Sequence, residues 1–250
     1  MNNFESKNCW ITGGGSGIGA ALALQLAEQG AQVIISGRNE ERLQNVADSH
    51  SNIMPIKLDV TNRESWKKAV EKVNDTGGHI DLAVFNAGTC EYVDINEFEP
   101  DLFKRVFDVN FMGTVNGINA VLPLLRKSAS GHIAAVTSSV ASLPLARAEA
   151  YGASKAATSY MMNSLRLDLR DSKIAVSIIK PGFVESPMTD KNDFPMPAII
   201  PADKAARLIV RGLAKRKNEI YFPGRFTWPL RFLSILPSGL QQIFTKRFTK

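Results

Sequence analysis

Short apolar runs alternate with amphipathic stretches of helical length from about residue 7 to about residue 223. This alternation is typical of repeated βαβ units, in which each helix connects two parallel strands of one sheet. It predicts an α/β fold with a parallel sheet of about seven strands and helices on both faces. Helices are expected over Ile18–Gln29 and Arg63–Asn74, among others. The expected strands are Asn8–Thr12, Gln32–Ser36, Ile53–Leu58, Ile80–Asn86, His132–Ser138, Ala175–Lys180 and Glu219–Phe222.

Length and charge limit the classes of protein to which the chain can belong. A chain of 250 residues, 44% of them hydrophobic, can bury one large core. We therefore expect a single domain over residues 1–223, followed by a short tail over residues 224–250. The formal net charge is +6, but residues 211–250 alone hold nine Lys or Arg and one acidic residue, Glu219. A nucleic-acid-binding protein would carry its basic residues across the folded body, so no nucleic-acid partner is expected.

The cysteines and the N-terminal residues bear on location. Cys9 and Cys90 form the pattern of neither a disulfide framework nor a metal site, so we expect two reduced thiols and no metal. The first seven residues hold no apolar run typical of a signal peptide or anchor. No segment reaches the ~18 uninterrupted apolar residues of a spanning helix. The expected location is cytoplasmic.

A glycine-rich turn follows the first predicted strand and leads directly into a helix. In this context the backbone N–H groups of such a turn can hold the pyrophosphate of a dinucleotide, and a Cβ would block its close approach. The common Gly-x-Gly-x-x-Gly/Ala spacing is met only by Gly15, Gly17 and Ala20, whereas Gly13, Gly17 and Gly19 form a longer variant. A flexible turn without a ligand is the alternative. The full run is Thr12-Gly13-Gly14-Gly15-Ser16-Gly17-Ile18-Gly19.

Tyr151 and Lys155 are four residues apart and therefore share one face of a predicted helix. A free tyrosine has a pKa of roughly 10, which is too high for proton transfer near neutral pH. A neighbouring ammonium group lowers the pKa of a phenol. The spacing thus suggests an acid/base pair, although two such residues also occur on solvated helix faces.

The glycine-rich turn and the Tyr151/Lys155 pair together resemble the short-chain dehydrogenase/reductase family of nicotinamide-dependent oxidoreductases. The resemblance covers about residues 7–223 and implies a Rossmann-like, doubly wound fold. Further family motifs follow in order: Asp59-Val60, Asn86-Ala87-Gly88, Asp108-Val109-Asn110 and Pro181-Gly182-Phe183-Val184. The expected cofactor-binding residues are Gly13, Ser16, Gly17, Ile18, Gly19, Arg38, Asp59, Val60, Asn86, Ala87, Gly88, Tyr151, Lys155, Pro181, Gly182 and Val184.

The resemblance also implies a reaction, which is hydride transfer between the nicotinamide and a carbonyl or secondary alcohol. The implied catalytic residues are Asn110, Ser138, Tyr151 and Lys155. Tyr151 is expected to act as general acid or base, and Ser138 to hydrogen-bond the substrate oxygen. Lys155 is expected to lower the pKa of Tyr151 and to bind the nicotinamide ribose. Asn110 is expected to anchor a water that relays protons towards solvent.

Two adjacent serines compete for the serine role. Counting from Gly131 and back from Tyr151, the family spacing falls on Ser138 without a gap. If the run Ser-Ser-Val-Ala is matched as a unit, Ser139 takes the role instead. A serine that only caps the backbone at the end of a strand is the third alternative.

The end of the second strand indicates the choice of cofactor. An acidic residue there would bind both ribose hydroxyls of NAD, and none is present between Ile34 and Asn39. Arg38 instead offers a planar, permanently charged group that suits a 2′-phosphate, so NADP(H) is favoured over NAD. In the alternative, Arg38 points to solvent at a helix start. The family's second basic position, inside the glycine turn, is Ser16 in this chain.

Two apolar segments depart from the alternation. The loop over residues 183–200 carries Phe183, Met188, Phe194 and Met196, which suggests a lid over an apolar or amphipathic substrate, although ordinary packing also uses such residues. The tail mixes apolar and basic residues and contains Pro229 and Pro237, which are expected to break it into short segments. It resembles segments that lie on a membrane surface, here the inner face, or alternatively packs over the cleft or a partner subunit.

The resemblance also bears on the oligomeric state and on alternative functions. By resemblance, helices around Asn110 and Tyr151 build a homo-oligomer, either a dimer or a tetramer. A non-catalytic NADP-binding regulator is one alternative function, but such chains usually lose the Tyr or the Lys. An epimerase or isomerase that uses the cofactor transiently is another alternative.

Overall fold

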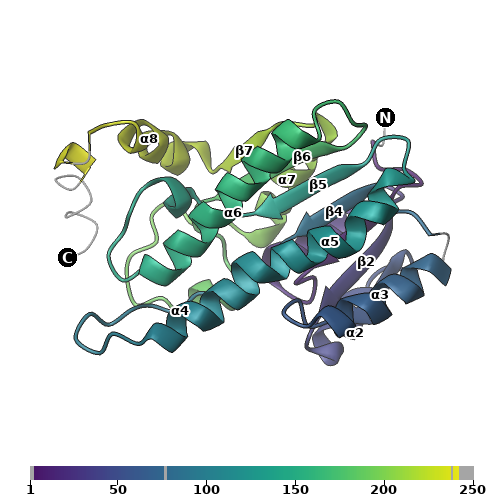
Figure 1. The fold of residues 1–250 in the computed structure, drawn as a ribbon, viewed down its shortest axis with the longest axis horizontal. Helices are drawn as coiled ribbons and strands as arrows, with labels where there is room; N and C mark the ends of the chain where they lie inside the picture. Colours follow the sequence, from purple (N-terminus) through teal and green to yellow (C-terminus); the bar gives the residue numbers. More distant parts are fainter. Residues whose placement is uncertain (1–2, 76–77, 238, 242–250) are drawn as a thin grey trace.

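One sheet of seven parallel strands lies at the centre of the molecule, as Figure 1 shows. The computed structural model describes residues 3–75, 78–237 and 239–241. The strands occur in the order β3-β2-β1-β4-β5-β6-β7, which confirms the predicted Rossmann-like, doubly wound sheet. They are β1 Asn8–Thr12, β2 Gln32–Gly37, β3 Ile53–Lys57, β4 Leu82–Phe85, β5 His132–Val136, β6 Ala175–Pro181 and β7 Glu219–Phe222.

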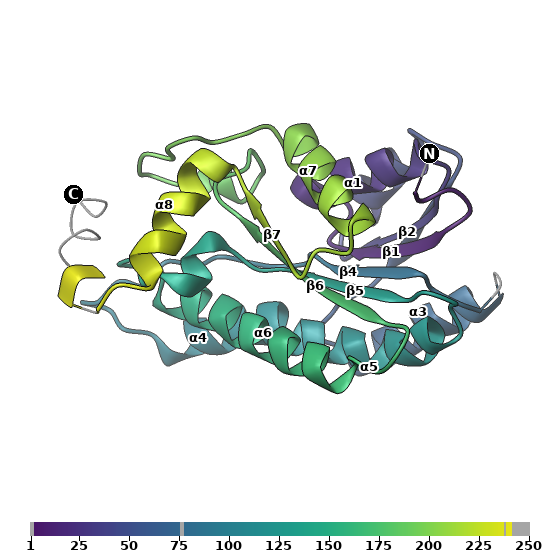
Figure 2. The ribbon, with the colours of Figure 1, turned by 90° about the horizontal axis from the view of Figure 1, so that it is seen from above.

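Helices cover both faces of the sheet (Figure 2). Residues of α1, α2 and α7 pack on one face, and residues of α3, α5 and α6 pack on the other. Because both faces are covered, the central strands β4 and β5 are buried along their whole length. β4 is a continuous apolar run, and β5 is apolar after His132. The helices are α1 Gly17–Ala27, α2 Glu40–Ala47, α3 Arg63–Asp75, α4 Pro100–Phe107, α5 Gly113–Arg126, α6 Glu149–Asp168, α7 Ala202–Ala214 and α8 Gly224–Ser234, with short helical turns η1 Asp108–Met112, η2 Ser139–Ser142 and η3 Thr189–Lys191.

The strand order reverses next to β1, which pairs with β2 on one side and with β4 on the other. The chain first builds the sheet outward from β1 to β3 and then returns to place β4 on the opposite edge of β1. Loops that leave the carboxyl ends of β1 and β4 therefore diverge to opposite faces of the sheet. This divergence opens a crevice, the usual ligand site of folds of this kind.

Several strands end earlier than the sequence predicts. β4 ends at Phe85 rather than Asn86, and β5 ends at Val136 rather than Ser138. In both places a polar residue leaves the ladder for another partner. The Asn86 amide N–H donates to Thr12 Oγ1 at 3.0 Å, and Ser138 Oγ accepts from the Val140 N–H at 3.2 Å.

The tail contains a helix that the sequence did not predict. Helix α8 runs through Pro229, so the prediction that this proline breaks the segment is wrong. Pro229 and Arg225 are both exposed, and water can therefore bond the Arg225 carbonyl that lacks its helical donor. Pro237 follows the end of α8, while residues 242–250 of the tail lie outside the described residues. In the part of the chain that the structure describes, no helix combines the length and apolar character needed to cross a membrane.

One buried histidine gives the fold a pH dependence. His132, on β5, is buried, and its Nε2 lies 2.8 Å from Ser177 Oγ. Because the Ser177 hydroxyl donates to the Lys217 carbonyl, the Ser177 oxygen accepts the proton of His132 Nε2. A neutral imidazole can make this contact. Burial, and secondarily the charge of Arg216, lowers the pKa of His132 from 6.5 to about 3.

The free energy of unfolding is expected to fall as the pH drops below about 6.5, because the unfolded chain then binds a proton that folded His132 rejects. The contribution of this residue amounts to roughly 1.4 kcal/mol per pH unit until the pH approaches the folded value. Urea unfolding at pH values between about 7.5 and 5 measures the slope. His132→Gln should flatten it, whereas His50→Gln, outside the core, should not. An unchanged slope in His132→Gln would assign the acid sensitivity to other groups.

Candidate active site

The predicted site residues gather along the carboxyl edge of the sheet, because they follow the ends of neighbouring strands. This edge includes the crevice between β1 and β4. In sheet order, Asp59 follows β3, Arg38 follows β2, Gly13 follows β1, Asn86 follows β4, Ser138 follows β5 and Gly182 follows β6. Residues far apart in the sequence thus lie along one edge of the sheet and flank the crevice.

The glycine-rich turn has the geometry of an anion cradle. Gly13 and Gly17 have positive φ angles of 68° and 51°, which favour glycine. Helix α1 begins at Gly17, and the Ser16 side chain makes no capping hydrogen bond to its first turn. The N–H groups and the positive end of the helix dipole are therefore left for a ligand, which fits a pyrophosphate.

Thr12 and Asn86 clamp the turn to β4. Thr12 Oγ1 accepts from the backbone N–H groups of Asn86 and Ala87 at 3.0 and 3.1 Å. Asn86 Nδ2 donates to the carbonyls of Thr12 and Gly13, both at 3.1 Å. Thr12 was not among the predicted site residues, although it directly precedes the glycine-rich turn.

A cavity of about 570 Å³ extends from the turn towards the loop after β6. Most of the predicted residues line it, and Ser139 lines it as well. The predicted lining residues are Gly13, Ser16, Gly17, Ile18, Asn86, Ala87, Gly88, Ser138, Tyr151, Lys155, Pro181, Gly182 and Val184. The other predicted residues, Gly19, Arg38, Asp59, Val60 and Asn110, lie outside this lining.

Three of these outlying residues lie on the β2 and β3 side of the crevice. Arg38 is exposed and directly follows β2. Asp59 Oδ1 accepts from the N–H and the hydroxyl of Thr61 at 2.9 and 2.8 Å. The Val60 side chain is buried, and its carbonyl accepts from the Trp66 indole at 3.0 Å. Arg38 and Asp59 are thus placed at the far end of the crevice from Tyr151.

Asn110 lies behind the cavity in the π-helical turn η1 and is buried. Its side-chain amide donates to the Thr89 carbonyl and to Ser154 Oγ, both at 2.9 Å, and Oδ1 accepts from the Thr89 N–H at 2.8 Å. A Cβ at Gly88 would lie 3.1 Å from Asn110 Oδ1 and 3.2 Å from Lys155 Nζ. Asn110 therefore fixes the loop after β4 against helix α6, next to the lysine.

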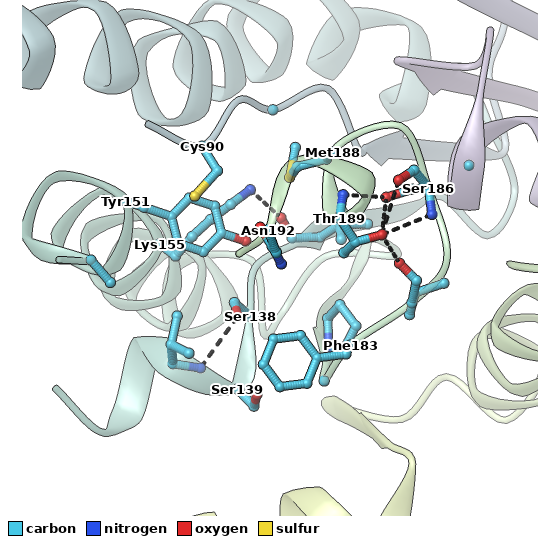
Figure 3. Close-up of a pocket in the computed structure, with 18 of the residues that line it drawn as sticks. Cys90, Ser138, Ser139, Tyr151, Lys155, Phe183, Ser186, Met188, Thr189 and Asn192 are labelled. Carbon is cyan, nitrogen blue, oxygen red and sulfur yellow. Dashed lines mark hydrogen bonds between the residues drawn. The ribbon is translucent and has the colours of Figure 1, made fainter. Parts of the chain in front are cut away.

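Tyr151, Ser138 and Lys155 meet at the floor of the cavity (Figure 3). Ser138 lies beside the Tyr151 phenol, and its hydroxyl accepts from the Val140 N–H at 3.2 Å. Lys155 Nζ lies one helical turn after Tyr151, 5.8 Å from the centre of its ring, and donates to the Val136 carbonyl at 2.9 Å. The predicted sharing of one helix face by Tyr151 and Lys155 is confirmed by this contact.

Burial dominates the protonation of these groups. It raises the pKa of Tyr151 above its ordinary value, assisted by Cys90 and opposed by the Ser138 hydroxyl. In the protein alone burial therefore outweighs any lowering of the Tyr151 pKa by Lys155, and that lowering stays a prediction. The Lys155 ammonium group faces the Val136 carbonyl, and burial lowers its own pKa from 10.5 to about 8. Lys155 thus remains mainly charged at neutral pH.

Several residues that the sequence analysis missed complete the cavity wall. Cys90 and Tyr92 follow β4 and lie near Tyr151, Leu145 and Arg147 precede α6, and Phe226 comes from α8. Cys90 is a free thiol, and burial raises its pKa. Cys90, Tyr92, Leu145 and Arg147 share only one sequence signal, which is that each lies close to a recognised motif. Phe226 belongs to the tail, and its place in the cavity wall fits the alternative in which the tail packs over the cleft.

Tyr92 and Arg147 also hold the loop over residues 183–200 against the cleft. The Tyr92 hydroxyl donates to Asn192 Oδ1 at 2.7 Å, and its ring packs edge-on against Phe194 with the centres 5.6 Å apart. Arg147 pairs with Asp193 at 3.2 Å and lies 5.2 Å from the centre of the Tyr92 ring. This loop, expected to form an apolar lid, indeed covers one side of the cavity.

Comparison with known proteins decides the family. The family model described as short chain dehydrogenase matches residues 7–195, which is most of the chain and includes the turn, Tyr151 and Lys155. The chain belongs to the short-chain dehydrogenase family. It is therefore an oxidoreductase, and the predicted resemblance is confirmed.

Relatives of this short-chain dehydrogenase support the assignment. An uncharacterized oxidoreductase of Myxococcus xanthus is 33% identical over 251 residues, which cover 99% of each chain. A short chain dehydrogenase from Burkholderia cenocepacia, solved in complex with NADP, matches with a TM-score of 0.84 at 27% identity and 99% coverage of both chains. A short chain dehydrogenase/reductase from Burkholderia phymatum, solved with NAD, matches with a TM-score of 0.85 at 23% identity, covering 92% of this chain and 94% of its own. At that identity the likeness shows the fold alone.

Proposed function

We propose that the protein transfers a hydride between NADP(H) and a carbonyl or secondary alcohol of an apolar or amphipathic substrate, with Tyr151 as general acid and base. The observation that carries the proposal is the meeting of Tyr151, Ser138 and Lys155 beside the glycine cradle. A dinucleotide held at the cradle would extend along the crevice towards this floor. The likeness to a dehydrogenase solved with NADP supports this cofactor.

The bound nicotinamide supplies or accepts the hydride. In reduction, the Tyr151 phenol gives its proton to the developing alkoxide, and in oxidation the phenolate removes it. The Ser138 hydroxyl, whose contact with Tyr151 lowers the pKa of the phenol, is placed to hold the same substrate oxygen. This contact favours Ser138 over Ser139 for the serine role, since Ser139 begins the short helix η2.

Lys155 and Asn110 support the proton transfer. The charged Lys155 compensates the negative charge that forms when Tyr151 gives up its proton, and it would bind the nicotinamide ribose. Asn110 holds the loop after β4 in place through Thr89 and Ser154. A water relay anchored at Asn110 stays a prediction. Together these residues would let Tyr151 recover its proton after each turnover.

The lining of the cavity supports an apolar or amphipathic substrate. Phe183, Met188, Phe194 and Phe226 line the cavity together with the polar residues Ser138, Tyr151 and Lys155. A substrate with one carbonyl and an apolar body fits this lining. We also propose a homo-oligomer, dimer or tetramer, because Tyr160 and Leu167 are 78% and 70% exposed on α6, the helix that carries Tyr151.

Net turnover distinguishes the enzyme from its alternatives. NADPH oxidation should be measured against aldehydes and ketones of increasing apolar length, and NADP reduction against the matching secondary alcohols. The proposal expects turnover that improves with apolar length. A cofactor-binding regulator or an epimerase would bind the cofactor and show no net oxidation or reduction, which would refute the proposed reaction. A cytoplasmic location and the division into residues 1–223 and 224–250 stay predictions.

Arg38→Ala is expected to reduce the preference for NADPH over NADH, measured as the ratio of kcat/KM values, by about 10- to 100-fold. The exposed Arg38 directly follows β2, where the ribose that carries the 2′-phosphate of a bound NADP(H) would lie. Arg126→Ala is a suitable control, because this exposed arginine ends α5 far from the crevice. A parent enzyme that prefers NADH would refute the assignment of NADP.

A further inference from the structure

Helix α8 has two faces of different character. Its inner face carries Phe226, Thr227 and Leu230, and the last two are 1% and 6% exposed. The Thr227 hydroxyl donates to the Pro223 carbonyl at 3.1 Å, which anchors the start of the helix. Figures 1 and 2 show α8 at one end of the molecule, beside the loop that covers the cavity. The inner face is thus packed, and only the outer face is available to a partner.

The outer face of α8 exposes large apolar side chains. Trp228, Phe232 and Ile235 are 66%, 64% and 76% exposed. Their spacings of four and three residues place them along one side of the helix. We refer to these three residues as the outer stripe. A row of exposed apolar side chains indicates an interaction surface, because ordinary protein surface exposes such side chains singly.

The charges around the outer stripe are positive. Arg225 and Arg231 are exposed on the same helix, and the Arg231 guanidinium lies 5.0 Å from the Tyr221 ring centre and 5.5 Å from that of Trp228. The sequence from residue 220 to residue 250 contains five Lys or Arg and no acidic residue. Glu219, just before it, already pairs with Lys180 at 2.8 Å. The outer stripe therefore complements an anionic partner.

We propose that the outer stripe of α8 binds the surface of an anionic phospholipid bilayer. Tryptophan and phenylalanine flanked by arginines are typical of helices that lie in a membrane interface. A protein interface buries about 800 Å² on each partner. The outer stripe consists of two side chains of one helix of 11 residues and of Ile235, which directly follows it, at an end of the molecule. This small surface suits a shallow apolar layer better than a broad protein surface.

The same helix forms part of the cavity wall. The centres of the Phe226 and Phe183 rings are 5.3 Å apart, and a Cβ at Gly182 would lie 2.7 Å from Phe226 Cδ1. Docking by the outer stripe would therefore hold the substrate cavity at the lipid–water boundary. If the proposed function holds, the enzyme takes its apolar substrate from that boundary. This uptake of substrate rests on the proposed function, whereas the binding of lipid does not.

Vesicle flotation of the full chain tests the binding without turnover. The probes are vesicles of phosphatidylcholine alone and vesicles that also contain phosphatidylglycerol. We expect the protein to float with the anionic vesicles only. Trp228→Ser combined with Phe232→Ser should weaken the partitioning by at least about tenfold, and Arg225→Gln by about fivefold. Unfolding temperature and NADPH binding establish that each variant is folded.

A matched control uses an equally exposed apolar residue at another surface. Ile95 is 75% exposed in an acidic loop that includes Asp94 and Glu97, and Ile95→Ser should leave vesicle binding unchanged. Equal flotation of the parent and the stripe variants would overturn the proposal. So would the absence of flotation together with self-association, measured by sedimentation velocity, that the stripe substitutions abolish, because the outer stripe would then be a subunit interface.

Discussion

Tyr151→Phe is expected to lower kcat by about 10²- to 10⁴-fold, the usual contribution of a positioned general acid or base. The substitution keeps the ring that packs at the cavity floor and removes only the phenol hydroxyl that lies beside Ser138. Affinity for NADPH should stay nearly unchanged, because the cradle and Lys155 are untouched. Steady-state kinetics and titration of NADPH fluorescence measure the two quantities separately.

Tyr92→Phe provides the matched control for this variant. Tyr92 also lines the cavity, but its hydroxyl donates to Asn192 of the covering loop. Its loss should change KM more than kcat, since a looser loop alters substrate binding rather than proton transfer. If Tyr151→Phe retained the parental kcat, Tyr151 would have no part in the chemistry.

Gly19→Ala is expected to lower the affinity for NADPH by about 100-fold, because small displacements of a binding loop have effects of this size. A Cβ at Gly19 would lie 2.2 Å from the Gly13 carbonyl oxygen and 2.6 Å from Asn86 Nδ2. Neither the turn backbone nor the clamped Asn86 can give way without losing hydrogen bonds. The crowding should also lower the free energy of unfolding by about 1–3 kcal/mol.

Calorimetric titration with NADPH and urea unfolding measure both effects of Gly19→Ala. Gly152→Ala is the matched control, because a Cβ at Gly152 would meet only the Val140 carbonyl oxygen, at 4.0 Å. This second substitution should leave the free energy of unfolding unchanged or slightly raised, since alanine favours a helix over glycine. Equal NADPH affinity in both variants would show that the close packing at Gly19 does not shape the cradle.

The strands were predictable because the sheet is covered on both faces. Buried strands are rich in apolar residues, as in β4 and in β5 after His132, and such runs are visible in the sequence. The predicted ends failed at Asn86, whose backbone N–H donates to Thr12, and at Ser138, whose hydroxyl caps the short helix η2. The first of these ends depends on Thr12, a neighbour distant in the sequence, and not on local propensity.

The site was predictable where its geometry is local. The glycine turn and the Tyr151/Lys155 pair each lie within one short segment, so spacing alone gives their arrangement. The walls of the cavity are assembled from distant segments, which is why Tyr92 and Arg147 were missed. The raised pKa of Tyr151 was missed for the same reason, because burial by the folded chain outweighs its charged neighbour in sequence.

The contact between Phe226 and Phe183 has a consequence for the order in which the protein is made. A ribosome releases the glycine turn, Tyr151 and Lys155 before it releases α8. These segments can therefore fold together while the side of the cavity that Phe226 covers is still open to water. That wall of the cavity closes only when α8 has emerged and the Phe226 ring packs against Phe183.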